Sequence, residues 1–298
     1  MTRRSWAQHG GWLVLPALLF LTLVFVLPFL GVVRVAVAGE PPPGTGTFFD
    51  VTVFRPDNLA AVAGDRLFRS VLAVTVRTAV IITTVCMVVA IPFAAYIHTR
   101  RGVWKGVLIA GVALPKLVNL LVLLYGVLLT LGSGGVINDV LTGLRIIDQP
   151  VRLFGNLFAV VFTEVLVILP YPVLLLLAAF NGSDDRQYDA ARSLGAGPVR
   201  AYVETVIRPA WPALVGAGLV SAVWAVGAFV GPLVLGNPPY YTVAVEVYLR
   251  ALEKLAWVEA AGWAVLGVAI FGLVLGGATM LGRWFEQRSA ARSIRVQP

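Results

Sequence analysis

The sequence predicts an all-α polytopic membrane protein with six transmembrane helices and both termini in the cytoplasm. Composition is the first reason: 59% of the 298 residues are hydrophobic and only 13% are charged, with a mean hydropathy of +0.87. A soluble domain has about 25% charged residues. The second reason is that apolar runs long enough to cross a bilayer, roughly 20 residues, recur along the chain. The third is that the basic residues lie in short clusters beside these runs.

Six apolar segments are long enough to span a bilayer, at residues 12–37, 71–97, 103–131, 157–180, 213–235 and 257–281. We therefore expect one transmembrane domain over residues 12–282, with cytoplasmic tails at 1–11 and 283–298. The first run is longer than the apolar core of a signal peptide and lacks a small-residue cleavage site, so no cleaved leader is expected. Proline inside the runs predicts kinked helices, at Pro28, Pro92, Pro115, Pro170 and Pro232.

The distribution of Lys and Arg assigns a side of the membrane to each loop. Thirteen basic residues lie on one side: Arg3, Arg4, Arg100, Arg101, Lys105, Arg186, Arg192, Arg200, Arg208, Arg283, Arg288, Arg292 and Arg295. Seven lie on the other: Arg55, Arg66, Arg69, Arg145, Arg152, Arg250 and Lys254. The positive-inside rule places the richer side, with both termini and the polar loop 181–212, in the cytoplasm. The net charge of +8 thus indicates membrane topology rather than a nucleic-acid partner.

The loop at 181–212 is a long polar interval with a pattern of its own. Asp184, Asp185 and Asp189 fall in the first turns of an expected helix, where acidic side chains favour the positive end of the helix dipole. Gly195 suits the end of that helix, and Pro198 suits the start of the next one. We therefore expect a helix, a glycine turn and a second helix between two membrane spans.

One face of this first helix is suited to contact with another protein. Tyr188, Ala191 and Leu194 follow one another at three-residue spacing and so share a face. The small side chains of Ala190 and Ala191 would let a partner approach closely. An ordinary amphipathic loop at the membrane surface is the plainer interpretation of the same pattern.

The segment DAARSLGAGPVRAYVETVIRP resembles the EAA loop of ABC-importer permeases, whose pattern is Glu-Ala-Ala, three residues, Gly, nine residues, Ile, one residue and Leu-Pro. The matching positions are Asp189, Ala190, Ala191 and Gly195. Two positions depart from the pattern. Aspartate replaces glutamate at 189, which keeps the carboxylate, and Arg208 stands where the closing proline is expected, with the proline one place later.

The similarity extends over residues 90–280. The segments 131–161 and 225–248, together with LPYPVLLLLAAF before the loop, are similar to permeases of the polyamine, aminoalkylphosphonate, iron and thiamine branch. The resemblance implies a type I ABC importer permease fold in the bacterial cytoplasmic (inner) membrane. It also implies that residues of the loop contact a cytoplasmic ATPase, namely Asp185, Tyr188, Asp189, Ala190, Ala191, Leu194 and Gly195.

The partners expected from this resemblance are two ABC ATPase subunits, which would bind ATP and Mg, and an extracytoplasmic substrate-binding protein. Six spans are too few for the whole pore, so a second permease is expected, either a related chain or another copy of this one. Membrane lipid surrounds the assembly. Among substrates, a polyamine such as spermidine or putrescine comes first, followed by aminoalkylphosphonate and then iron(III) or thiamine.

Ionisable residues inside the expected spans mark the candidate translocation pathway, because a charge there costs at least about 3 kcal/mol. Lys116, Glu164 and Arg77 fall within spans. Lys116 and Glu164 would face the pathway and either pair with each other or meet a charged substrate, whereas a structural ion pair is the alternative. Gly231 followed by Pro232 would break the fifth span there. With two residues that fit the third span of the branch, the candidates are Lys116, Asn119, Tyr125, Glu164, Gly231 and Pro232.

No catalytic or metal-binding constellation is recognisable in the sequence. The two histidines, His9 and His98, fall near membrane edges, Cys86 is the single cysteine, and no lysine follows a phosphate-binding glycine loop. We therefore expect a transport subunit without a cofactor of its own rather than an enzyme. A secondary carrier or channel that works without an ATPase is the rival interpretation, since Lys116 and Glu164 would suit an ion-coupled carrier. An intramembrane enzyme is a third.

Overall fold

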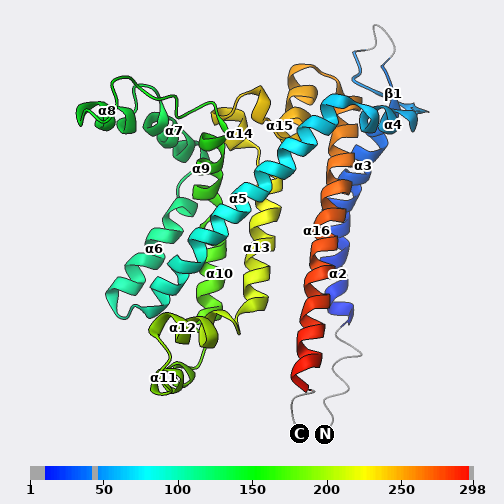
Figure 1. Cartoon of the computed structure of the whole chain (residues 1–298). Helices are drawn as coiled ribbons and strands as arrows, with labels where there is room; N and C mark the ends of the chain where they lie inside the picture. Colours follow the sequence, from blue (N-terminus) through cyan, green and yellow to red (C-terminus); the bar gives the residue numbers. More distant parts are fainter. Residues whose placement is uncertain (1–10, 42–45, 295–298) are drawn as a thin grey trace. The chain divides into compact units, whose positions relative to one another are not determined.

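A computed structural model describes residues 11–41 and 46–294, and helices dominate the described chain (Figure 1). The predicted tail at 1–11 lies outside the described residues except for Gly11. The helices are α2 (Gly11–Leu21), α3 (Leu27–Ala36), α4 (Asp57–Gly64), α5 (Arg66–Thr99), α6 (Val103–Leu117), α7 (Leu120–Leu131), α8 (Val136–Gly143), α9 (Leu157–Ile168), α10 (Pro170–Phe180), α11 (Asp185–Ser193), α12 (Pro198–Tyr202), α13 (Trp211–Val226), α14 (Val230–Leu235), α15 (Val243–Tyr248) and α16 (Trp257–Ile294).

Short π-helical turns continue three of these helices, at Thr22–Val26, Val203–Ile207 and Leu249–Glu253, and a 3-10 turn covers Pro238–Tyr240. The strands β1 (Ala38–Gly39) and β2 (Asp50–Phe54) form a small antiparallel sheet. This two-stranded sheet departs from the all-α expectation. It occupies the connector between the first two predicted spans, where the Gly- and Pro-rich sequence does not favour a helix.

The chain divides into two compact units, and the first comprises residues 1–70 and 246–270. Its described core pairs Phe68 with Trp263, whose rings meet edge to face at 5.0 Å between centroids. Both side chains are almost completely buried. In this unit α4 follows the sheet and packs close to α16, because a Cβ atom added at Gly262 would lie 3.2 Å from the Val62 side chain.

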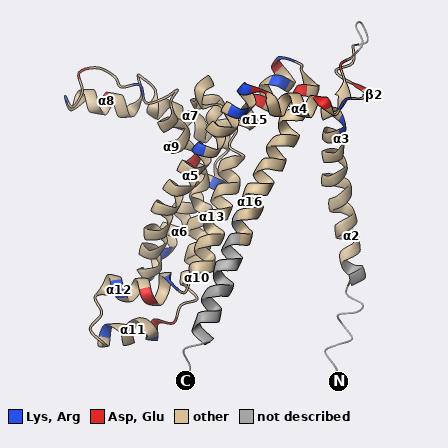
Figure 2. Ribbon diagram, turned by 45° about the vertical axis from the view of Figure 1, so that its right-hand side comes forward, with Lys and Arg blue, Asp and Glu red and all other residues tan. Residues whose placement is uncertain are grey.

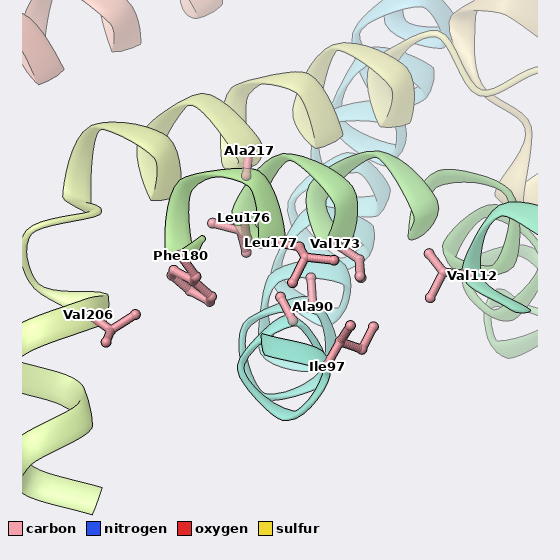
Figure 3. Close-up of a cluster of buried hydrophobic side chains, with 10 residues drawn as sticks. Ala90, Ile97, Val112, Val173, Leu176, Leu177, Phe180, Val206 and Ala217 are labelled. Carbon is pink, nitrogen blue, oxygen red and sulfur yellow. The ribbon is translucent and has the colours of Figure 1, made fainter. Parts of the chain in front are cut away.

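The second unit comprises residues 71–245 and 271–298. One core cluster of this unit joins α5, α6, α10, α13 and the π-helical turn after α12 (Figure 3). The α10 side chains form the middle of the cluster, with Leu176 and Phe180 fully buried. They pack against Ala90 and Ile97 of α5 and against Ala217 of α13. The small alanines on α5 and α13 let these helices approach α10 closely.

The described helices support a multi-pass arrangement. Four of them are long and apolar enough to cross a bilayer, at Val14–Ala36, Arg66–Thr99, Leu120–Gly143 and Trp257–Gly277. Two bent pairs bring the number to as many as six: α9 with α10, bent by 43°, and the helical segment Pro198–Ile207 with α13, bent by 77°. Figure 2 shows charged residues on α11 and α12 and none along the ribbons of α10 and α13.

The predicted third span at 103–131 is not one helix, which corrects the expectation. α6 ends at Leu117 and α7 begins at Leu120, with extended backbone at Val118 between them. Asn119 caps α7 by accepting a hydrogen bond from the backbone N–H of Leu121 at 2.9 Å. The capping side chain satisfies an N–H group that a break would otherwise leave unpaired. Because an apolar-run criterion counts composition only, it did not detect this break.

The break near Pro232 also lies at another place than predicted. α13 ends at Val226, and the break covers 227–229, so that Pro232 falls in the first turn of α14. Proline is tolerated in a first turn because its missing N–H group has no helical partner there. At the other end of the chain, α16 extends to Ile294, thirteen residues beyond the expected end of the sixth span at 281.

Candidate functional site

The loop at 181–212 folds into a well-capped helix, α11. Asp184 is its N-cap residue and accepts a hydrogen bond from a backbone N–H of the first turn at 3.0 Å. At the other end, Gly195 has a φ of +89°. Its N–H bonds to the carbonyl of Arg192 at 3.0 Å, and the N–H of Ala196 bonds to the carbonyl of Ala191 at 3.1 Å. This is a Schellman ending, in which the left-handed residue is usually glycine.

The turn after α11 presents apolar side chains to the surroundings. Leu194 is 90% exposed, and Val199 on α12 is 75% exposed. Tyr188 and Ala191 are only half-buried, so the three-residue face is turned partly toward the protein and ends in an exposed leucine. The other residues predicted to contact an ATPase are exposed: Asp185, Asp189, Ala190 and Gly195.

Two side-chain hydrogen bonds tie this loop to α5 and α6. His98 Nδ1 lies 3.0 Å from the hydroxyl oxygen of Tyr202, which follows α11 on α12. Lys105 Nζ donates to Asn181 Oδ1, just before α11, at 2.9 Å. A cavity of about 510 Å³ lies behind these contacts. Its charged lining combines both signs: Arg100, Arg101, Lys105, Asp184, Asp185 and Asp189.

The exit of the loop is a sharp bend rather than a proline-terminated helix. The Arg208 guanidinium forms an exposed ion pair with Glu204 at 2.7 Å, and its backbone N–H closes the π-helical turn on the carbonyl of Val203. Trp211 then begins α13, and the two helical segments meet at 77°. Arg208 therefore occupies an exposed helix end, a position that accepts a polar side chain where the EAA pattern has proline.

A second group of functional candidates lies inside the apolar part of the second unit. The ammonium nitrogen of Lys116 is 4.1 Å from the ring centroid of Tyr171 and 5.2 Å from that of Trp224. The two rings are stacked, with their centroids 5.0 Å apart and their planes inclined by 17°. Lys116, near the end of α6, thus has aromatic partners on α10 and α13.

Glu164 of α9 is buried next to the break between α13 and α14. Its side chain is close to the backbone of Gly231: the carboxylate accepts a hydrogen bond from the Gly231 N–H, and a Cβ atom at Gly231 would lie 2.5 Å from Glu164 Oε1. The residue is only 8% exposed. A cavity of about 140 Å³ lies beside it, lined also by Thr163, Trp224 and Phe229.

Lys116 and Glu164 do not form an ion pair with each other. The ion pairs of the described residues are Arg208–Glu204, Arg250–Glu246 and Arg250–Glu259. Lys116 is near enough to Glu164 to interact with it electrostatically, but its direct partners are aromatic rings. Lys116 and Glu164 are therefore not a direct ion pair, but they are close enough for each charge to affect the other.

A family model described as "Binding-protein-dependent transport system inner membrane component" matches residues 86–290, which include both groups of candidates. The chain belongs to this family. It is a multi-pass inner-membrane protein and the permease subunit of an ABC importer, as the resemblance of its central loop implied. It is therefore a transport subunit and not an enzyme.

Several curated permeases are similar to this permease over most of their length. The spermidine/putrescine transport system permease protein PotB of Escherichia coli is 26% identical over 223 residues, which are 75% of this chain and 81% of that protein. PotB of Haemophilus influenzae is 26% identical over 81% of this chain and 83% of its own. The molybdenum transport system permease protein ModB of Azotobacter vinelandii is 29% identical over 67% of this chain and 88% of its own.

Solved structures share the fold of the permease. A bacterial alginate ABC transporter in complex with an alginate pentasaccharide-bound periplasmic protein contains a chain that matches with a TM-score of 0.76 at 14% identity. The match covers 95% of this permease and 98% of that chain. A second structure of a bacterial alginate-importing ABC transporter matches with a TM-score of 0.71 at 13% identity. The prediction of a type I ABC importer permease fold is confirmed, whereas the cytoplasmic location of both termini stays a prediction.

The structure separates the predicted pathway residues of the permease into three places. Glu164 and Gly231 are in contact, and Pro232, the next residue of α14, is buried. Asn119 caps α7, and Tyr125 of the same helix is 64% exposed. Their roles in transport remain predictions. Lys116 belongs to the aromatic group and lies one residue before the end of α6.

Sequence reasoning missed the partners of these residues, because they come from distant parts of the chain. Tyr171 and Trp224 are ordinary aromatic residues of apolar runs, and no local spacing relates them to Lys116. A further network, centred on a buried arginine, also went unnoticed. Arg250, only 2% exposed, pairs with Glu246 and Glu259, and its guanidinium lies 3.7 Å from the ring centroid of Trp263. The sequence signal for this network was the four-residue spacing of Glu246 and Arg250, which places the two side chains on one face of a helix.

Proposed function

We propose that this permease forms one half of the translocation pathway for a polyamine of the spermidine or putrescine type. An extracytoplasmic binding protein delivers the solute, and a second permease, a related chain or another copy, completes the pore. Two ABC ATPase subunits bind ATP and Mg and drive the transport. The names of the PotB relatives support the substrate class, and the alginate transporter in complex with its periplasmic protein supports the mode of delivery.

The observation that carries the substrate proposal is the buried carboxylate of Glu164 at a helix break. A carboxylate buried among apolar helices is costly unless it is hydrogen-bonded and meets a positive charge. The Gly231 N–H supplies one hydrogen bond, and the neighbouring cavity of about 140 Å³ leaves room next to the carboxylate. Transporters use such helix breaks to place polar groups along a pathway. An amine passing through the cavity would supply the missing positive charge.

The coupling half of the proposal rests on α11. ATP-driven closure of the ATPases would push against the exposed Leu194 and the residues beside it. The hydrogen bonds of His98 with Tyr202 and of Lys105 with Asn181 would pass this movement to α5 and α6. Since α10 packs against both α6 and α13, the movement would reach the helices that carry Lys116 and Trp224. Packed helices and side-chain hydrogen bonds of this kind can carry coupling between distant sites.

Uptake of radiolabelled spermidine by proteoliposomes that contain the complete transporter tests the proposal. We expect uptake that needs ATP, the ATPase subunits and the binding protein, and that falls at least tenfold in Glu164→Gln. This substitution keeps the size of the side chain and removes the charge. Uptake without ATP would instead support the carrier interpretation. Full uptake of a different class of solute, with none of spermidine or putrescine, would overturn the polyamine proposal and leave the ATP-driven permease standing.

A further inference from the structure

The stacked rings of Tyr171 and Trp224 hold the ammonium group of Lys116, and these three residues come from three different helices. Both ring centroids lie within about 6 Å of the Lys116 ammonium nitrogen, the range over which an aromatic face attracts a cation. Tryptophan gives the strongest attraction of this kind. The two stacked rings form a small aromatic site for an ammonium group, and the Lys116 side chain occupies it.

The site lies deep in the apolar part of the molecule. Counted along α6 from Val103, Lys116 is about 20 Å from the helix end that adjoins the α11 loop. Trp224 is at about the same distance from the start of α13. Both positions fall well within a hydrocarbon core about 30 Å thick. A lysine at such a depth faces a protein interior or a water-filled cavity. Lys116 is half-buried and Trp224 is 46% exposed, so the aromatic site is open on one side.

The aromatic site is continuous with the Glu164 cavity, because Trp224 belongs to both. Trp224 contacts the Lys116 ammonium group and also lines the cavity of about 140 Å³ beside the Glu164 carboxylate. The rings of Tyr171 and Trp224 therefore attract one ammonium group through their aromatic faces, and the neighbouring carboxylate of Glu164 attracts another. Two ammonium groups joined by a short carbon chain match this arrangement.

We propose that Tyr171 and Trp224 form a binding site for an ammonium group of the transported solute, and that Lys116 fills this site as a tethered substitute when no solute is present. The proposal rests on the proposed function, since it takes the solute to be an amine. An arriving amine displaces the Lys116 ammonium group from the rings. Lysine suits this exchange because its compact charge sits on a flexible four-carbon stem, unlike the rigid planar fork of arginine.

The exchange has a direct consequence for affinity. A tethered group competes at a high effective concentration, so the aromatic site is free in only a fraction of the molecules. The apparent affinity for an amine is reduced by that fraction. After the solute has moved on, the returning lysine prevents it from binding again. Lys116 thereby favours release, which an importer needs as much as binding.

Binding of radiolabelled spermidine and of n-butylammonium to the permease complex in lipid nanodiscs tests this inference. Lys116→Met removes the competing charge and keeps a chain of similar length. We expect it to lower the Kd for both amines by about tenfold, the gain for a site that is free in roughly one-tenth of wild-type molecules. Lys116→Arg keeps a cation over the rings and should show none of this gain. Lys116→Met combined with Trp224→Leu should lose the gain, whereas Lys116→Met with Trp224→Phe should keep most of it.

The outcomes separate this inference from the proposed function. If spermidine is taken up with ATP but Lys116→Met leaves the Kd of both amines unchanged, the inference is overturned and the proposed function stands. A gain for n-butylammonium without any spermidine uptake supports the ammonium site and overturns the polyamine proposal. An equal gain for acetate, a small anion, would mean that the variant merely opens a space, and this too would overturn the inference.

Discussion

Replacement of Leu194 by alanine gives a quantitative test of the coupling surface. Leu194 is 90% exposed in the isolated permease and follows α11 directly. If an ATPase groove covers this side chain, the substitution removes three buried carbon atoms at about 0.8 kcal/mol each, or about 2 kcal/mol in total. The affinity of the permease for its ATPase should then fall about 30-fold. Folding should change by less than about 0.5 kcal/mol, because an exposed side chain contributes little to stability.

The assay measures binding of the transporter's own ABC ATPase to the permease in nanodiscs, together with the thermal unfolding of each variant. Leu144→Ala is the matched control, since Leu144 is 66% exposed and lies on the predicted extracytoplasmic side. The control should bind the ATPase like wild type. The reasoning is refuted if Leu194→Ala binds with unchanged affinity, or if both variants lose affinity to the same extent.

Three further substitutions test individual contacts. Asp184→Ala removes the N-cap of α11 and should cost about 1 kcal/mol of local helix stability, which would be measured as faster hydrogen exchange in α11. Asp184→Asn should keep the protection from exchange. Equal exchange rates in the two variants would contradict the capping role. Gly231→Ala should displace the Glu164 carboxylate and reduce transport at least tenfold. Gly227→Ala should transport normally, because a Cβ atom added there meets nothing closer than 3.6 Å. Normal transport by both variants would oppose a role for the contact between Glu164 and Gly231. Arg250→Met should leave the Glu246 carboxylate, whose side chain is only 13% exposed, without its partner. We expect this to cost about 3 kcal/mol and to lower the melting temperature. An unchanged melting temperature would show that the network is not stabilising.

The coupling loop was predictable because its signals are local. Asp184 is an N-cap residue by composition and position, and Gly195 adopts the positive φ that glycine favours. The orientation of α11 was less predictable from the sequence. Three-residue spacing grouped Tyr188 and Ala191 with Leu194, but the structure leaves Leu194 almost completely exposed while the other two are half-buried. Packing against distant parts of the chain decides such differences in exposure, and this packing cannot be predicted from sequence spacing alone.

The membrane spans illustrate a second limit. Their apolar character follows from composition, but the interruption at Asn119 lies inside an apolar run that looks continuous. The same holds for the break at 227–229, which precedes the proline expected to cause it. The partners of Lys116 could not be predicted from the sequence for a different reason. Tyr171 and Trp224 are 55 and 108 positions away along the chain, and only the packing of α10 against α6 and α13 brings them together.

A cysteine in place of Leu194 tests most directly whether the turn after α11 touches an ATPase. Cys86 is the chain's only cysteine and is buried, so a Cys86→Ser background is free of competing thiols. In the assembled transporter, a short cross-linker with one thiol-reactive end and one photoreactive end should join Leu194→Cys to the ATPase subunit, and Leu144→Cys should give no such product. ATP turnover should change the yield as the ATPases close. Cross-linking of Leu194→Cys only to lipid or to another permease, with none to the ATPase, would contradict the account.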